Sequence, residues 1–207
     1  MPAIHETRLP VPCSRLRGQR ILISQSGARF RDIAVDPLAH CMLLSIEEEG
    51  AAYGAASRGN IASGSRHPTS ELPTHLLVHD LLAAERPGYT ALLHAHVNEL
   101  IAMSMHPGLR TKDAFASALM SVHPEMPVYF PGGIGFVPYI DAGTSAIGEA
   151  TTAEFRTVDI VVWQRHGVLA VGRDIDEAFD RIAIAAKAAS LWLLCRQNGF
   201  DPCVPSA

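Results

Sequence analysis

The stretch from Ile160 to Gly172, IVVWQRHGVLAVG, constrains the fold of this 207-residue chain more than any other. Two short apolar runs of this kind are typical of strands buried in the interior of a protein. His166 and Gly167 stand between them, and a polar imidazole inside a hydrophobic segment needs a hydrogen-bond partner or a chemical task. We therefore expect two strands, Ile160–Arg165 and Val168–Val171, interrupted at a histidine of functional interest.

Two further histidines stand one residue apart in the sequence LLHAH, near the end of an expected strand over Thr90–His96. Side chains two residues apart on a strand share a face, so His94 and His96 would point to the same side. Together with His166 they could hold one metal ion in a three-histidine site with an open coordination position. The alternative is a strand that carries two polar residues at its end, and the spacing alone leaves both interpretations open.

A second histidine pair, His75 and His79, lies on an expected helix that begins near Ser70 and stops at Pro87-Gly88. Residues four apart share a helical face, which also suits two metal ligands. The pair lacks the glutamate that follows the first histidine in an HExxH protease. We interpret these two residues as helix–sheet packing and hydrogen bonding.

Two glutamates, Glu71 and Glu125, stand in different sequence surroundings. Glu71 stands at the expected helix start beside Thr69 and Ser70, where hydroxyls and free helical amides could hold an anion such as phosphate. The ordinary alternative is a first-turn carboxylate stabilised by the helix dipole. Glu125 lies in the proline-rich segment SVHPEMPVYFPGG, where a solvated surface position is the simpler interpretation.

The remaining pattern mixes strands and helices along one chain. A capping box at Asp174–Glu177 opens a long helix with an apolar stripe that includes Phe179 and Ile182, and Gly199 ends it. The other expected elements are four strands and two helices: Arg20–Ser24, Cys41–Ile46, Val128–Phe130, Phe136–Ile140, Asn98–Met105 and Thr144–Thr157. Strands and helices so intermixed, without a repeat or a linker, indicate a single α/β or α+β domain.

Composition excludes several classes of partner. The net charge is −4 and no block of Lys or Arg stands out, which argues against nucleic acid or an anionic membrane surface. No apolar run approaches the roughly 20 residues of a membrane span, and the start lacks the pattern of a signal peptide. The four cysteines have no ligand spacing. We expect a cytoplasmic protein.

The motifs PTSELPTHL, LLHAH and WQRHGVLAVG, in this order and spacing, resemble those of the class II aldolase/adducin family. The likeness extends from about Ile21 to Leu194. It implies an α/β fold, a three-layer α/β/α sandwich around a mainly antiparallel central sheet. It also implies one domain over residues 1–207, in which residues 1–20 form an atypical N-terminal segment.

The resemblance further implies a set of site residues. His94, His96 and His166 would bind one Zn²⁺ per subunit, or another divalent metal. Glu71 falls on the family's catalytic glutamate, and Glu125 on a glutamate that transfers protons across a subunit interface, typically in a fourfold-symmetric homotetramer. The positions that help to hold the substrate phosphate are Ser26, Gly27, Thr69 and Ser70.

The implied activity is zinc-dependent cleavage of a ketose 1-phosphate, with L-rhamnulose 1-phosphate the favoured substrate. The products would be dihydroxyacetone phosphate and L-lactaldehyde. The alternatives are a fuculose-phosphate aldolase, a ribulose-phosphate 4-epimerase, a sugar-phosphate dehydratase and a non-catalytic adducin-like protein. Two departures bear on the phosphate site: SQSG replaces the common TGSG, and no Gly-Asn motif precedes Ile21.

Overall fold

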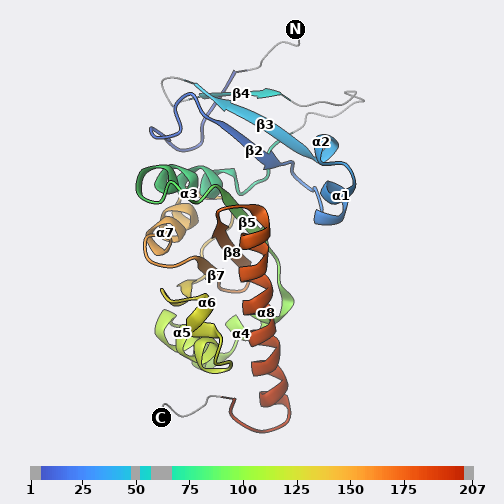
Figure 1. The fold of residues 1–207 in the computed structure, drawn as a ribbon, viewed down its shortest axis with the longest axis vertical. Coiled ribbons are helices and arrows are strands. Elements are labelled where there is room, and N and C mark those ends of the chain that lie inside the picture. The colour runs from blue at the N-terminus through green and yellow to red at the C-terminus, as the bar shows by residue number, and fades with distance from the viewer. Residues whose placement is uncertain (1–5, 48–51, 57–66, 203–207) are drawn as a thin grey trace. The chain divides into compact units, whose positions relative to one another are not determined.

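The computed structural model describes residues 6–47, 52–56 and 67–202, and its elements are labelled in Figure 1. The chain forms two compact units. The first contains residues 1–84 and 142–148, and the second contains residues 85–141 and 149–207. Each unit has its own hydrophobic core.

The first unit is built on an antiparallel four-stranded sheet in the order β1-β4-β3-β2. The strands are β1 (Glu6–Arg8), β2 (Arg20–Ser24), β3 (Cys41–Ile46) and β4 (Ala52–Ala56). Buried and exposed side chains alternate along β2, because successive residues of a strand point to opposite faces. The helices of this unit are α1 (Phe30–Val35), α2 (Pro37–His40) and α3 (Leu72–Glu85), whose last residue lies in the second unit.

The described part of the N-terminal segment contributes to this first core. Leu9, Val11, Cys13 and Leu16 are buried against Ile21 and its neighbours. Residues 1–5 lie outside the described residues, and the expectation of one domain over the whole chain stays a prediction.

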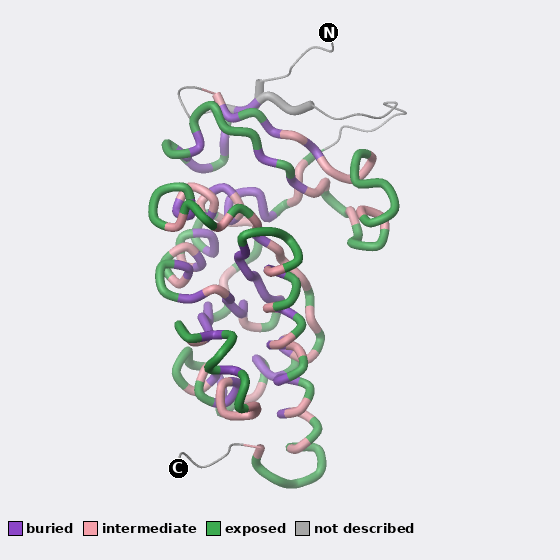
Figure 2. The backbone as a smooth tube through the Cα atoms, viewed as in Figure 1, coloured by how far each residue is buried: buried purple, intermediate pink, exposed green. Residues whose placement is uncertain are grey.

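The second unit contains a mixed sheet in the order β5-β8-β7-β6. The strands are β5 (Ala91–Ala95), β6 (Gly135–Val137), β7 (Ile160–Trp163) and β8 (Gly167–Gly172). Every residue of β7 and β8 is buried, as the apolar run in the sequence predicts (Figure 2). The β6–β7 pair is parallel and the other two pairs are antiparallel.

Helices of the second unit cover one face of this sheet. The long helix α8 (Ile175–Gln197) packs along β8 and β5, and α4 (Asn98–Ser104) packs against α8 (Figure 1). Side chains from both helices and from α5 (Lys112–Ser121) form the core with Phe136, Ile160 and Val162. The remaining helical segments are η1 (Pro107–Leu109), α6 (Met126–Tyr129) and α7 (Ser145–Glu154), which begins in the first unit.

The α/β class is confirmed, and the described strands are divided between two four-stranded sheets where we expected one central sheet. The expected strand Val128–Phe130 is wrong, because His123–Phe130 turns back through the one-turn helix α6. Val128 is 75% exposed there, so its apolar side chain does not mark a buried strand. Within the described ranges, no helix combines the length and the apolar character that a membrane crossing requires.

Candidate metal centre

Three histidines from two neighbouring strand ends converge in the second unit. His94 lies on β5, His96 directly follows β5, and His166 lies in the turn that joins β7 to β8. Antiparallel pairing of β5 with β8 brings these positions together, since Ala95 pairs with Val168. One candidate ligand atom from each ring lies within 4.8 Å of the others. This is the one such group of three potential ligands among the described residues.

The hydrogen bonding of His94 fixes which of its nitrogens is available. Nδ1 lies 3.1 Å from the carbonyl oxygen of Val168, which can only accept, so Nδ1 carries the proton. Nε2 is left with its lone pair, and it lies 3.2 Å from Nε2 of His96. Two imidazole nitrogens on one tetrahedral Zn²⁺, each at about 2.0–2.1 Å, would be about 3.3 Å apart. This pair of donors therefore fits a metal ion of this size, and the donor of His166 lies within 4.8 Å of both.

The protonation states also suit metal binding. Burial, reinforced by His96 and then His166, lowers the pKa of His94 to about 3. Burial and then His96 lower the pKa of His166. Both imidazoles are therefore neutral at pH 7, the form that binds a metal ion.

A buried tryptophan, Trp163, packs against two of the three histidines. The ring of Trp163 lies 4.9 Å from that of His94 and 5.1 Å from that of His166, between ring centroids. Trp163 is 1% exposed, and its indole N–H donates to the hydroxyl of Thr151 at 2.7 Å. Because Thr151 holds the indole N–H and the ring contacts both His94 and His166, Trp163 limits the positions that the two imidazoles can adopt.

The turn that carries His166 is held by backbone and side-chain contacts. Trp163 pairs with Gly167, so the turn contains only Gln164, Arg165 and His166. The hydroxyl of buried Ser104, on α4, accepts from the backbone N–H of Arg165 at 2.9 Å. Sequence reasoning missed Ser104 and Trp163, because neither stands out from ordinary core residues before the topology is known.

Gly167 allows the two strands to approach at the histidines. A Cβ atom there would lie 2.6 Å from the carbonyl oxygen of Ala95 and 3.1 Å from ring carbons of both His94 and His96. A backbone oxygen cannot move aside as a flexible side chain can, so any larger residue would push the strand ends apart.

We predict that Gly167→Ala lowers the free energy of unfolding by about 1–3 kcal/mol, the usual effect of overpacking. It should also weaken metal binding, because the added methyl group displaces the rings of His94 and His96. Chemical denaturation and a zinc titration measure the two effects. Gly88→Ala is the matched control, since no heavy atom lies within 4 Å of its added Cβ. A Gly167→Ala protein as stable as the parent would contradict the packing argument.

The first unit holds the predicted catalytic glutamate in a defined position. Glu71 is 6% exposed and directly precedes α3. Its Oε2 accepts a hydrogen bond from the backbone N–H of Gly143 at 3.3 Å, and its own N–H donates to the hydroxyl of Thr69. A buried carboxylate with a fixed orientation is suited to proton transfer.

The four predicted phosphate positions lie on two adjoining backbone segments. Gln25 and Pro68 form an antiparallel bridge, and the N–H of Ser26 donates to the carbonyl of His67 at 2.9 Å. The N–H of Thr69 donates to the carbonyl of Ser24 at 3.0 Å. Gly27 has φ of 77°, a conformation that glycine adopts readily. Ser26, Gly27, Thr69 and Ser70 are thus brought together in the first unit.

The other sequence candidates have simpler surroundings. Glu125 is exposed at the start of α6, with its Oε2 3.8 Å from Nδ1 of His123. Burial lowers the pKa of His79 to about 4, as expected for a neutral packing residue on α3. Neither His75 nor His79 joins a group of three potential ligands in the described part of the chain.

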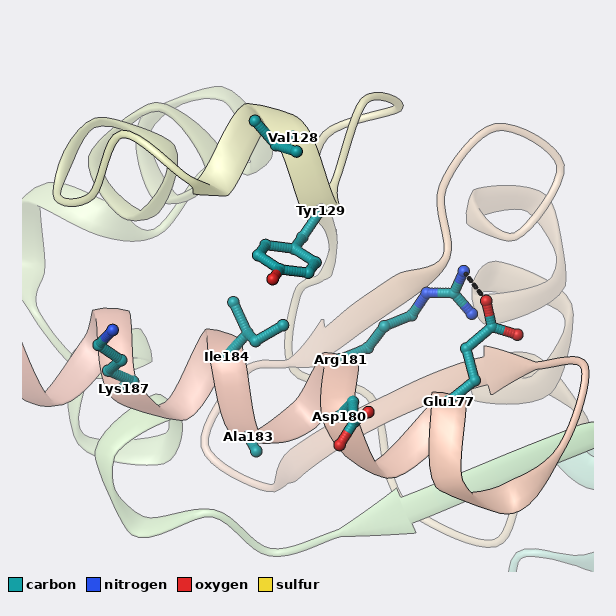
Figure 3. Close-up of a pocket in the computed structure, with 8 residues that line it drawn as sticks. All are labelled: Val128, Tyr129, Glu177, Asp180, Arg181, Ala183, Ile184 and Lys187. Atoms are coloured by element: carbon teal, nitrogen blue, oxygen red, sulfur yellow. Dashed lines mark hydrogen bonds and ion pairs between the residues drawn. The ribbon is translucent and has the colours of Figure 1, made fainter.

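A cavity of about 560 Å³ lies between α6 and α8 and contains none of the predicted site residues (Figure 3). Tyr129 and Ile184 face one another across it, and Arg181 is bound to Glu177 at 3.1 Å. Arg181 also pairs with Asp159 at 3.2 Å, so its charge is already balanced. The histidine cluster is the better candidate for chemistry.

Comparison with known proteins agrees with the motifs. Residues 11–193 match the family described as "Class II Aldolase and Adducin N-terminal domain". A rhamnulose-1-phosphate aldolase of Bacteroides thetaiotaomicron is 35% identical over 187 residues, covering 90% of this chain and 68% of the relative. The enzyme of the same name from Listeria monocytogenes serovar 1/2a is 31% identical over 189 residues, covering 89% of this chain and 66% of that protein.

A solved structure of an aldolase has a similar fold. The crystal structure of a sugar-phosphate aldolase from Thermotoga maritima has a TM-score of 0.80 and 29% identity, covering 95% of this chain and 80% of that one. The present chain spans about two thirds of the length of the two rhamnulose-1-phosphate aldolases. With the family match over most of its residues, the chain belongs to the class II aldolase and adducin family.

Proposed function

We propose that this chain acts as a metal-dependent aldolase that reversibly cleaves L-rhamnulose 1-phosphate to dihydroxyacetone phosphate and L-lactaldehyde. The observation that carries the proposal is the convergence of His94, His96 and His166 within 4.8 Å, in a chain whose relatives are named rhamnulose-1-phosphate aldolase. A protein that used this fold for assembly alone would have no need of three histidines whose ring nitrogens meet around one point.

The three histidines are the proposed ligands of one Zn²⁺ per chain. The neutral state of His94 and His166, the unprotonated Nε2 of His94 and its 3.2 Å separation from Nε2 of His96 support this assignment. When bound, such an ion supplies Lewis acidity to a substrate carbonyl. Trp163 and the carbonyl of Val168 orient the rings, so little reorganisation is needed on binding.

Proton transfer is assigned to Glu71. In the direction of synthesis, this carboxylate would take a proton from the hydroxymethyl carbon of dihydroxyacetone phosphate. Its burial and its hydrogen bond from Gly143 support a fixed, desolvated base. The backbone and hydroxyl groups of Ser26, Gly27, Thr69 and Ser70 are the proposed phosphate ligands.

Glu125 is the proposed second proton donor, acting from a neighbouring subunit on the aldehyde fragment. Its carboxylate is exposed, as contact with another chain requires. A homotetramer, an active site between subunits and a cytoplasmic location stay predictions.

A panel of sugar phosphates tests the proposal. With purified protein and added Zn²⁺, we expect L-rhamnulose 1-phosphate to yield dihydroxyacetone phosphate at the highest kcat/KM, with fuculose 1-phosphate the nearest competitor. Coupled reduction of dihydroxyacetone phosphate and chromatography of the sugars identify the products. Two fragments indicate an aldolase and an isomeric pentulose phosphate an epimerase. No reaction with any sugar, in protein that binds zinc, would exclude the proposed function.

A further inference from the structure

A second concave surface of the second unit is lined by two arginines. The cavity has a volume of about 320 Å³ and is lined by Met105, Arg110, Tyr139, Gln164 and Arg165. Both arginines are exposed. Within the described part of the chain, neither guanidinium donates a hydrogen bond or forms an ion pair with another side chain.

An acidic residue, Asp141, is bound to one of the lining residues. The hydroxyl of Tyr139 donates to Oδ1 of Asp141 at 3.0 Å. This hydrogen bond and the charge of Asp141 raise the pKa of Tyr139, and the positive charge of Arg165 opposes that rise. Two guanidinium groups therefore line the cavity beside a phenol and an amide, and Asp141 places one negative charge near them.

The backbone around Arg165 is held in an unusual conformation. Arg165 has φ of 66° and is the one non-glycine residue of the described chain with a positive φ. An L-residue in this region is strained, and glycine would relieve the strain. The side-chain amide of Gln164 donates a hydrogen bond to the backbone carbonyl of Ser104. Its oxygen accepts one from the backbone N–H of Tyr139 at 3.1 Å. The turn is thus fixed, and an arginine stands at a position where glycine would be less strained.

We propose that this cavity is a binding site for a small phosphate-type oxyanion, held by the guanidinium groups of Arg110 and Arg165. The planar fork of a guanidinium matches two oxygens of a phosphate group, and the cavity volume suits a small ligand. None of the five lining residues belongs to the proposed catalytic, metal-binding or phosphate-binding set. Arg165 directly precedes His166, so an anion bound here would contact the turn that carries a proposed metal ligand.

Titration of the full chain with inorganic phosphate tests this site. We expect Arg110→Gln and Arg165→Gln each to weaken the binding at least tenfold, measured by calorimetry at constant ionic strength. Arg165→Lys should give an intermediate loss, because it keeps the charge and removes the fork. Arg20→Gln, on the exposed face of β2, is the matched control and should bind as the parent does.

A second variant separates binding from folding. Arg165→Gly should raise Tm by about 2–4 °C, because it relieves the left-handed strain, and should still weaken phosphate binding at least tenfold. Phosphate binding that is unchanged in both Arg110→Gln and Arg165→Gln would overturn the proposal. A parent protein that does not bind phosphate at about 10 mM would also overturn the proposal.

Steady-state kinetics then distinguish the two sources of the anion. A rise in KM for the sugar phosphate in Arg165→Gln, with kcat unchanged, would identify the ligand as the phosphate of the substrate and would overturn the assignment of that phosphate to the Ser26–Gly27 and Thr69–Ser70 segments. Unchanged kinetics with lost phosphate binding identify it as free phosphate. Because calorimetry does not depend on turnover, a failure of the aldolase proposal leaves this test valid.

Discussion

Replacement of His94 by alanine should remove both the metal and the activity. His94 is half-buried, burial is the main cause of its lowered pKa, and its Nε2 lies 3.2 Å from that of His96. Removal of one of three protein ligands leaves two, which is too few for a stable catalytic zinc site. If the metal contributes about 4 kcal/mol to the transition state, turnover should fall about 1,000-fold.

Elemental analysis and a dihydroxyacetone-phosphate release assay on the same preparation measure both effects. His106→Ala is the matched control, because His106 is a half-buried imidazole of the same unit that contacts Trp192 rather than the cluster. We expect this control to keep its metal and most of its activity. Full turnover by metal-free His94→Ala protein would refute the proposed role of the cluster.

Much of this site could be predicted from local pattern. Alternation on a strand gives the shared face of His94 and His96, and the apolar run on both sides of His166 gives two adjacent buried strands. The cap of α8 also follows from sequence, since Asp174 accepts from the N–H of Glu177 at 2.8 Å. The order β5-β8-β7 does not follow from any local signal, yet it is what brings His166 to the other two.

The errors have a common physical origin, which is that burial depends on tertiary neighbours. Phe179 was expected on the buried stripe of α8, yet it is 55% exposed, while Ala178 and Ile182 are buried. Apolar residues occur on both sides of that helix, so hydrophobic spacing alone could not select the inner face. The missed helix α5 is different, because its signals stand in the sequence: the hydroxyl of Thr111 accepts from the N–H of Ala114 as an N-cap, and Phe115, Ala118 and Leu119 follow at helical spacing.

Replacement of Glu71 by glutamine should separate chemistry from metal binding. The amide oxygen of glutamine can still accept the hydrogen bond from Gly143, so the local fold should be preserved, but the side chain can no longer take a proton. We expect kcat to fall about 100- to 10,000-fold, the usual contribution of a general base. Zinc content should stay at the parental value, which His94→Ala cannot maintain.

Glu85→Gln at the other end of α3 is the matched control, because Glu85 forms a surface ion pair with Arg156 at 3.0 Å. That pair should contribute little, so this variant should keep parental activity and stability. Measurement of kcat, KM and zinc content across the three proteins distinguishes the roles. Parental kcat in Glu71→Gln would remove Glu71 from the chemistry, whereas a loss of zinc in proportion to activity would make it a metal ligand. Only a fall in kcat at constant metal content agrees with a base that is held by Gly143 and acts on substrate carbon.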